Sequence, residues 1–155
     1  MSHFFLDSSA LVKRSSPERG SAWVKSLTDP ALGHMIIVAE ITLAEVAAAL
    51  AAKHRAPHGL SRQELTEAVS DFLGHCHSEY QLVPVERFII ERAVGLTQHH
   101  RLRGYDAVQL GAALVTNQVL ASADLAALTF VTADDDLLQA AQAEGLSSEN
   151  PNMHS

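Results

Sequence analysis

The stretch Phe4-Phe5-Leu6-Asp7-Ser8-Ser9 decides the fold, because an apolar run ends there on a carboxylate and two hydroxyl residues follow. Such a run predicts a short buried strand over residues 3–6. We expect Ser8 and Ser9 to cap a helix over residues 10–14. Asp7 then lies just beyond the carboxyl end of the strand, which is the edge where open parallel sheets bind ligands.

The same alternation of apolar runs and helical patterns continues along the chain. Further strands are expected over residues 34–39, 80–85 and 128–132, with a weaker one near 146–148. Helices are expected from Pro17, and over residues 41–55, 61–77, 86–100, 104–118 and 134–144. Strands that alternate with helices imply parallel pairing and helices on both faces of the sheet.

The predicted fold class is therefore α/β, a three-layer α/β/α sandwich with a central parallel sheet of four to five strands. The length favours a single domain over residues 1–155. The polar tail from about residue 147 to 155 is expected to be loosely ordered.

Composition limits the function classes. Hydrophobic residues make up 47% of the chain and charged residues 19%, as in globular proteins. Cys76 is the only cysteine and no signal-peptide pattern is present, so we expect a cytoplasmic location. The apolar runs are too short for a membrane span. The formal charge of −7 argues against a nucleic-acid partner unless the acids hold cations.

Three further acids interrupt apolar segments, as Asp7 does. Glu45 lies in the alanine-rich stretch 41–52, Asp106 follows Tyr105, and Asp134 follows the apolar run that begins at Leu128. A buried carboxylate costs several kcal/mol unless something compensates its charge. Asp7 and Asp134 both follow strands, whereas Glu45 and Asp106 lie about one turn into helices that can flank the same cleft.

One shared cation explains all four acids most simply. All-oxygen ligation selects Mg²⁺ or Mn²⁺ over zinc. Asp136 is a candidate further ligand, although the run Asp134-Asp135-Asp136 leaves the local assignment open. A zinc site at His75-Cys76-His77 is disfavoured, because residues two apart on a helix point about 200° away from one another.

Each acid also has an ordinary explanation. Asp134 has the position of a helix N-cap, Asp7 could be one too, and Arg103 could pair with Asp106. Glu45 lies in a helix that is apolar nearly all round, so we expect that helix to be buried. Ion-pair networks hold buried acids in many proteins, so the argument for a metal depends on the four acids together.

The pattern resembles the four acidic motifs of PIN domains. The segments that carry the resemblance are Phe4–Lys13, Thr42–Val46, Arg103–Leu110 and Phe130–Asp134, in this order. Within that group the chain is similar to the VapC toxins of bacterial toxin–antitoxin pairs. The resemblance runs from about residue 3 to residue 152, and none of the four acids is lost.

The resemblance implies a metal-dependent endoribonuclease that hydrolyses RNA phosphodiester bonds with water activated by Mg²⁺ or Mn²⁺. It implies a homodimer that a cognate VapB-like antitoxin holds silent. It assigns the catalytic and metal-binding role to four carboxylates, those of Asp7, Glu45, Asp106 and Asp134. Ser9 and Thr132 would support them.

Basic and apolar residues near these motifs suggest further contacts. The candidates for contacts with RNA phosphates are Lys13, Arg14, Arg101 and Arg103. An apolar patch for a two-fold dimer is expected from Phe72, Leu73, Phe88 and Ile89.

Other functions fit the same fold class. A catalytically silent module of this fold could regulate through protein partners alone. A receiver-like phosphoacceptor would need paired acids at the first strand, where only Ser8 and Ser9 accompany Asp7. A haloacid-type phosphatase would need an aspartate where Ser9 stands.

Overall fold

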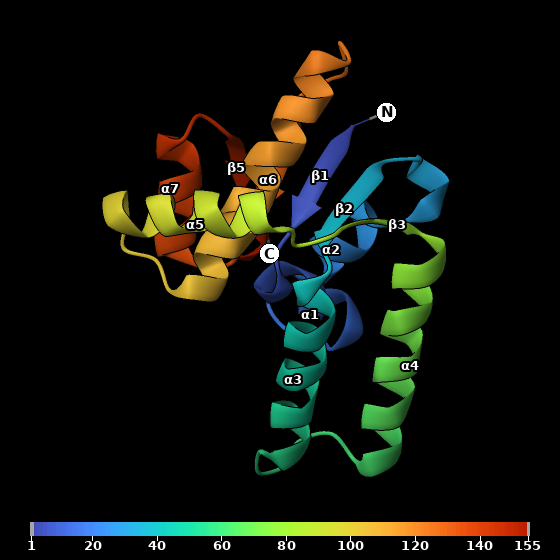
Figure 1. Cartoon of the computed structure of the whole chain (residues 1–155). Helices are drawn as coiled ribbons and strands as arrows, with labels where there is room; N and C mark the ends of the chain where they lie inside the picture. Colours follow the sequence, from blue (N-terminus) through green and yellow to red (C-terminus); the bar gives the residue numbers. More distant parts are fainter. Residues whose placement is uncertain (1, 155) are drawn as a thin grey trace.

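A parallel sheet of five strands forms the centre of the molecule (Figure 1). The computed structural model describes residues 2–154 of the chain. The strands are β1 (His3–Leu6), β2 (Met35–Ala39), β3 (Tyr80–Val83), β4 (Leu128–Val131) and β5 (Ser147–Glu149). Their order is β3-β2-β1-β4-β5, and each strand is parallel to its neighbours. The predicted α/β class is confirmed.

Helices cover both faces of this sheet. They are α1 (Ser8–Ser15), α2 (Ser21–Leu27), α3 (Ile41–Arg55), α4 (Arg62–Ser78), α5 (Arg87–His99), α6 (Gly104–Ser122) and α7 (Asp135–Ala143). Alternate residues of a strand point to opposite faces, so Phe5 packs with α5, α6 and α7 while Leu6 packs with α1 to α4. Two apolar cores result, one on each face, as a three-layer sandwich requires.

The strand order creates a topological switch point beside β1. From β1 the chain moves outward through β2 to β3, and it then returns to form β4 on the other side of β1. The carboxyl ends of β1 and β4 lie next to each other, since Leu6 pairs with Val131. Ligands of open parallel sheets bind at such a point.

The start of α1 differs from the prediction. Asp7, not Ser8 or Ser9, is the N-cap, and its side chain accepts a hydrogen bond from Ala10 N. Both serines are the first residues of the helix. Aspartate is as good an N-cap as serine, so the helix begins directly after Asp7, the first residue beyond the strand.

The predicted helix start at Pro17 is also wrong. Helix α2 begins at Ser21, after Gly20 with φ of 86°. A Cβ on Gly20 would lie 2.6 Å from the carbonyl oxygen of Pro151, so the C-terminal segment fixes this turn.

The tail is ordered over residues 147–153, contrary to the expectation of a loose end. Strand β5 pairs with β4, and a 3-10 helix follows over Pro151–Met153. Pro151 is buried, and the ring of His154 stacks on Trp23 with centroids 4.2 Å apart. These contacts are tertiary, so the polar composition of the tail did not reveal them.

Helix α3 is buried along one stripe rather than all round. Thr42, Val46 and Leu50 are buried, whereas Ala44 and Ala48 are exposed. Helices α3 and α4 pack side by side and extend together away from the sheet (Figure 1). Among residues 2–154, no helix is both long and apolar enough to cross a membrane.

Candidate functional site

The Asp7 carboxylate lies at the switch point and is enclosed by donors. It is 3% exposed. Its Oδ1 accepts hydrogen bonds from Ser9 Oγ at 2.7 Å and from Ala10 N at 3.0 Å, and its Oδ2 accepts one from Thr132 Oγ1 at 2.6 Å. The first turn of α1 and the residue that follows β4 thus hold the Asp7 carboxylate from both sides.

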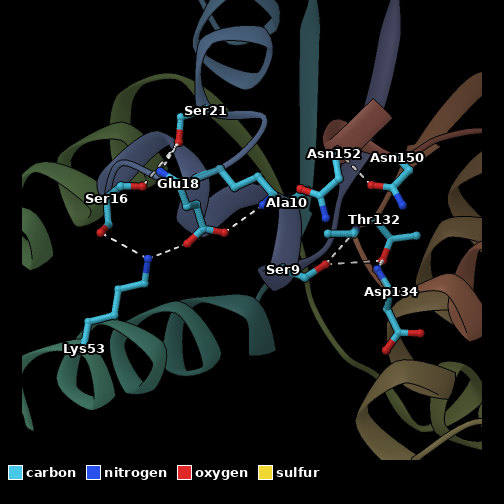
Figure 2. A network of polar contacts seen from close by, with 12 residues as sticks. Ser9, Ala10, Ser16, Glu18, Ser21, Lys53, Thr132, Asp134, Asn150 and Asn152 are labelled. Carbon is cyan, nitrogen blue, oxygen red and sulfur yellow. Dashed lines mark hydrogen bonds and ion pairs between the residues drawn. The ribbon is translucent and has the colours of Figure 1, made fainter. Parts of the chain in front are cut away.

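Ser9 and Thr132 also bind the start of α7. Ser9 Oγ accepts a hydrogen bond from Ala133 N at 2.9 Å, and Thr132 Oγ1 accepts one from Asp134 N at 3.1 Å (Figure 2). The two hydroxyl oxygens lie 3.3 Å apart. The residues predicted to support the acids therefore tie Asp7 to the backbone that carries Asp134.

Burial dominates the electrostatics of Asp7. Desolvation raises the pKa of this carboxyl to about 6, although the donors from Thr132, Ser9 and Ala10 lower it. The negative charge of Asp106 raises it further. The fold thus holds the Asp7 carboxylate where water solvates its negative charge poorly. A nearby cation would favour the ionised form and lower the pKa again.

Glu45 is half-buried and is held by a residue that the sequence did not single out. The amide nitrogen of Gln109 donates to Glu45 Oε1 and to Thr42 Oγ1, each at 2.7 Å. Gln109 is 1% exposed, and its Oε1 has no hydrogen-bond partner in the described part of the chain. The only sequence signal was a polar residue three positions after Asp106 in an apolar helix. Burial, followed by the charge of Asp106, raises the pKa of Glu45.

Asp106 and Asp134 line one open pocket of about 250 Å³, here called the carboxylate pocket. Its other lining residues are Arg101, Leu102, Arg103 and Asp136. Burial and then the charge of Asp134 raise the pKa of Asp106, while Arg103 lowers it. Asp134 is exposed and caps α7, because its Oδ1 accepts from Leu137 N at 2.9 Å.

The four acids influence one another through Asp106. Its charge acts on Asp7 and on Glu45, and the charge of Asp134 acts on Asp106. Within residues 2–154, however, no three His, Cys, Asp or Glu side chains form a group able to hold a metal ion. The donors fit Mg²⁺ or Mn²⁺ in kind, since all four are carboxylate oxygens.

Two of the four predicted phosphate contacts have intramolecular partners instead. Lys13 is 4% exposed and its Nζ lies 2.8 Å from Glu18 Oε1, while Lys53 binds the same carboxylate (Figure 2). Arg14 donates to Glu79 Oε2 and to the Tyr80 hydroxyl, each at 2.7 Å. These contacts link α1 to its neighbours, so Lys13 and Arg14 have a structural role.

Arg101 and Arg103 lie where the prediction placed them. Both are exposed and line the carboxylate pocket. Neither forms an ion pair with another residue of the described chain. Their guanidinium groups are available to a phosphate.

The predicted apolar patch is only partly exposed. Phe72 and Ile89 are 1% exposed and belong to the cores, because they lie on the inner faces of their helices. Leu73 and Phe88 are exposed. A separate apolar groove of about 390 Å³ lies between α5 and α6, and its lining residues include Ile90, Val94 and Tyr105.

The chain matches the PIN domain family over residues 4–143. A toxin–antitoxin complex from Klebsiella pneumoniae has the same fold at 19% identity, with a TM-score of 0.59 over 96% of this chain and 97% of that chain. VapBC2 from Rickettsia felis, bound to a promoter DNA fragment, matches at 15% identity with a TM-score of 0.63, over 96% of this chain and 98% of that chain.

The Sarcin-Ricin loop cleaving toxin VapC20 from Mycobacterium tuberculosis matches at 13% identity with a TM-score of 0.59. That alignment covers 92% of this chain and 95% of the toxin. No curated protein matches the chain significantly in sequence. At these identities the solved structures establish a shared fold.

Proposed function

The chain belongs to the PIN domain family, and on that basis we propose that it is a metal-dependent endoribonuclease and the toxin of a toxin–antitoxin pair. One observation carries the proposal: Asp7 is buried at the switch point of the sheet, and Ser9 and Thr132 tie it to the backbone that carries Asp134. The proposal is supported by the fold, which is shared with toxins of toxin–antitoxin complexes and with a toxin that cleaves the Sarcin-Ricin loop.

Asp7, Glu45, Asp106 and Asp134 would hold Mg²⁺ or Mn²⁺, with Asp136 as a candidate further ligand. When bound, the cation supplies the means to activate water and to offset negative charge on the phosphate.

Ser9 and Thr132 keep the Asp7 carboxylate in one orientation, because their hydroxyl groups donate to both of its oxygens. Gln109 of α6 donates to one oxygen of Glu45, Oε1. Arg101 and Arg103 would bind backbone phosphates at the rim of the carboxylate pocket and bring the scissile bond to the acids.

The proposal includes two protein partners and a cytoplasmic location, where the RNA substrate is found. A second copy of the chain would bind the apolar groove between α5 and α6, which is lined by the exposed apolar side chains of Ile90, Val94 and Tyr105. A VapB-like antitoxin would insert an arginine into the carboxylate pocket, because a guanidinium engages carboxylates bidentately.

The test is cleavage of a structured RNA by the purified chain with Mg²⁺, with Mn²⁺ and with a chelator. We expect internal cuts with either metal and intact RNA with the chelator. The Asp106→Asn variant should leave the RNA intact under all three conditions. If the wild-type chain cuts no RNA with either metal, the silent binding module is the better interpretation.

A further inference from the structure

A second pocket adjoins the carboxylate pocket. It has a volume of about 300 Å³ and is lined by His99, His100, Arg101, Asp136, Gln139 and two alanines of α7. We call it the His99 pocket. Arg101 and Asp136 line both pockets, so the surface is hollowed from Asp106 past Arg101 to His99.

The wall of the His99 pocket is fixed by contacts between helix ends. His100 is the C-cap of α5 and Glu144 is the C-cap of α7. His100 Nε2 lies 2.7 Å from Glu144 Oε2, and the carbonyl oxygen of His100 accepts a hydrogen bond from Leu102 N at 3.0 Å. The loop that carries Arg101 is thereby held against α7 rather than left to move freely.

The two pockets differ in how many acidic side chains line them. The carboxylate pocket has three acids, whereas the His99 pocket has only Asp136, at the junction of the two. Arg101, His99 and Gln139 are all exposed. A guanidinium group, an imidazole and an amide are the donors that proteins use on nucleic-acid phosphates and base edges.

We propose that the His99 pocket binds a nucleotide adjacent to the two that the scissile bond joins, so that single-stranded RNA runs from the acids over Arg101 to His99 and Gln139. This inference rests on the proposed nuclease function and adds the path of the substrate to it. Both pockets are small for ligand sites, which suits one strand passing along the surface rather than an enclosed ligand.

His100 is a positioning residue in this arrangement. Its contact with Glu144 occupies one ring nitrogen, and its role is to place the backbone that presents Arg101. Arg101 itself contacts the phosphate that joins the nucleotide in the His99 pocket to the nucleotides at the acids.

The first test is equilibrium binding of a labelled single-stranded octanucleotide RNA with Mg²⁺ over a range of KCl concentrations. The Asp7→Asn background limits cleavage during the measurement. Adding Arg101→Gln should reduce the slope of log affinity against log salt by about 0.7, because one phosphate of a single strand is then no longer neutralised by the protein. The matched control is Arg62→Gln, because Arg62 is an exposed arginine at the start of α4. The control should leave the slope unchanged.

The second test is steady-state cleavage by the otherwise wild-type chain. Arg101→Gln and His99→Asn should raise KM for the octanucleotide with little change in kcat. His99→Asn should not alter the cleavage of a dinucleotide, which is held at the acids and does not reach the His99 pocket. Thermal unfolding of each variant shows whether the fold is retained.

The outcomes separate this inference from the function on which it rests. If the wild-type chain cleaves RNA but Arg101→Gln changes neither slope nor KM, the strand path is wrong and the nuclease assignment stands. If His99→Asn affects the dinucleotide as much as the octanucleotide, the pocket does not bind a flanking nucleotide. If the wild-type chain neither binds nor cleaves RNA, both proposals fail.

Discussion

Asp7 carries a buried charge that its three hydrogen-bond donors compensate only in part. Desolvation raises its pKa from 3.8 to about 6 in spite of them. A folded-state pKa above the unfolded value means that the unfolded chain ionises first as the pH rises. The resulting loss of stability starts near pH 4 and is complete above about pH 6.

Replacing Asp7 with Asn should therefore stabilise the metal-free protein at neutral pH and abolish RNA cleavage. The amide keeps the shape and removes the charge, so the gain is at most about 3 kcal/mol at pH 7 and vanishes near pH 4. Urea unfolding in chelator at the two pH values measures it. Asp29→Asn is the control, since Asp29 is an exposed cap. Equal stability of wild type and Asp7→Asn at pH 7 would show that the Asp7 charge costs nothing.

Gln109 joins α6 to α3 by hydrogen bonds that a hydrophobic side chain cannot make. Gln109→Met should destabilise the protein by about 1–3 kcal/mol, because Thr42 and Glu45 lose a buried donor. Calorimetric titration should also show weaker Mn²⁺ binding. Gln118→Met on the exposed face of the same helix should change stability by less than about 0.5 kcal/mol. If both variants have the same stability and the same Mn²⁺ affinity, Gln109 has no role in the site.

The elements differ in how far their own sequence determines them. Apolar runs locate β1, β2 and β4, and the bounds of α3 follow from its alanine-rich pattern, because these signals are local. The start of α2 is set by Pro151, more than a hundred residues away. Strand β5 is polar and forms through pairing with β4, so composition alone suggests a loose tail.

Gly20→Ala should destabilise the protein much more than Gly33→Ala. Both glycines have positive φ, 86° and 69°, so both substitutions strain the backbone. A Cβ at Gly20 also collides with the Pro151 backbone, while nothing lies within 4 Å at Gly33. The difference in melting temperature isolates the contact between α2 and the C-terminal segment. If both variants lose the same melting temperature, the C-terminal segment around Pro151 moves away from position 20 at little cost in free energy.

At the scale of the whole molecule, self-association tests the apolar groove between α5 and α6. Val94 lies in this groove and is 60% exposed, whereas Val119 is 62% exposed and lies outside it. We expect the wild-type chain and Val119→Glu to sediment as dimers at micromolar concentration. Val94→Glu should sediment as a monomer, because a buried charge at the interface has no partner. A wild-type monomer would exclude this interface.

The sequence predicts those residues of the candidate site that are acidic within apolar segments. Asp7, Glu45 and Asp106 each interrupt an apolar run, so the sequence alone marks them. The spacing between the carboxylates and the role of Gln109 depend on how α3 and α6 pack against the sheet. The same limit explains Lys13 and Arg14, whose acidic partners come from other elements or turns.

The order of the strands in the sequence also determines when the site can assemble during protein synthesis. The Thr132–Asp7 hydrogen bond joins residues 125 positions apart, and Thr132 N donates to Glu149 O of the last strand. A ribosome adds about 5–20 residues per second, so β1 waits many seconds for β4 to emerge. Throughout that interval the nascent chain holds Asp7 without the donor from Thr132. Translation interrupted before β4 leaves a chain with three of its five strands and without Asp134 and Asp136 of the carboxylate pocket.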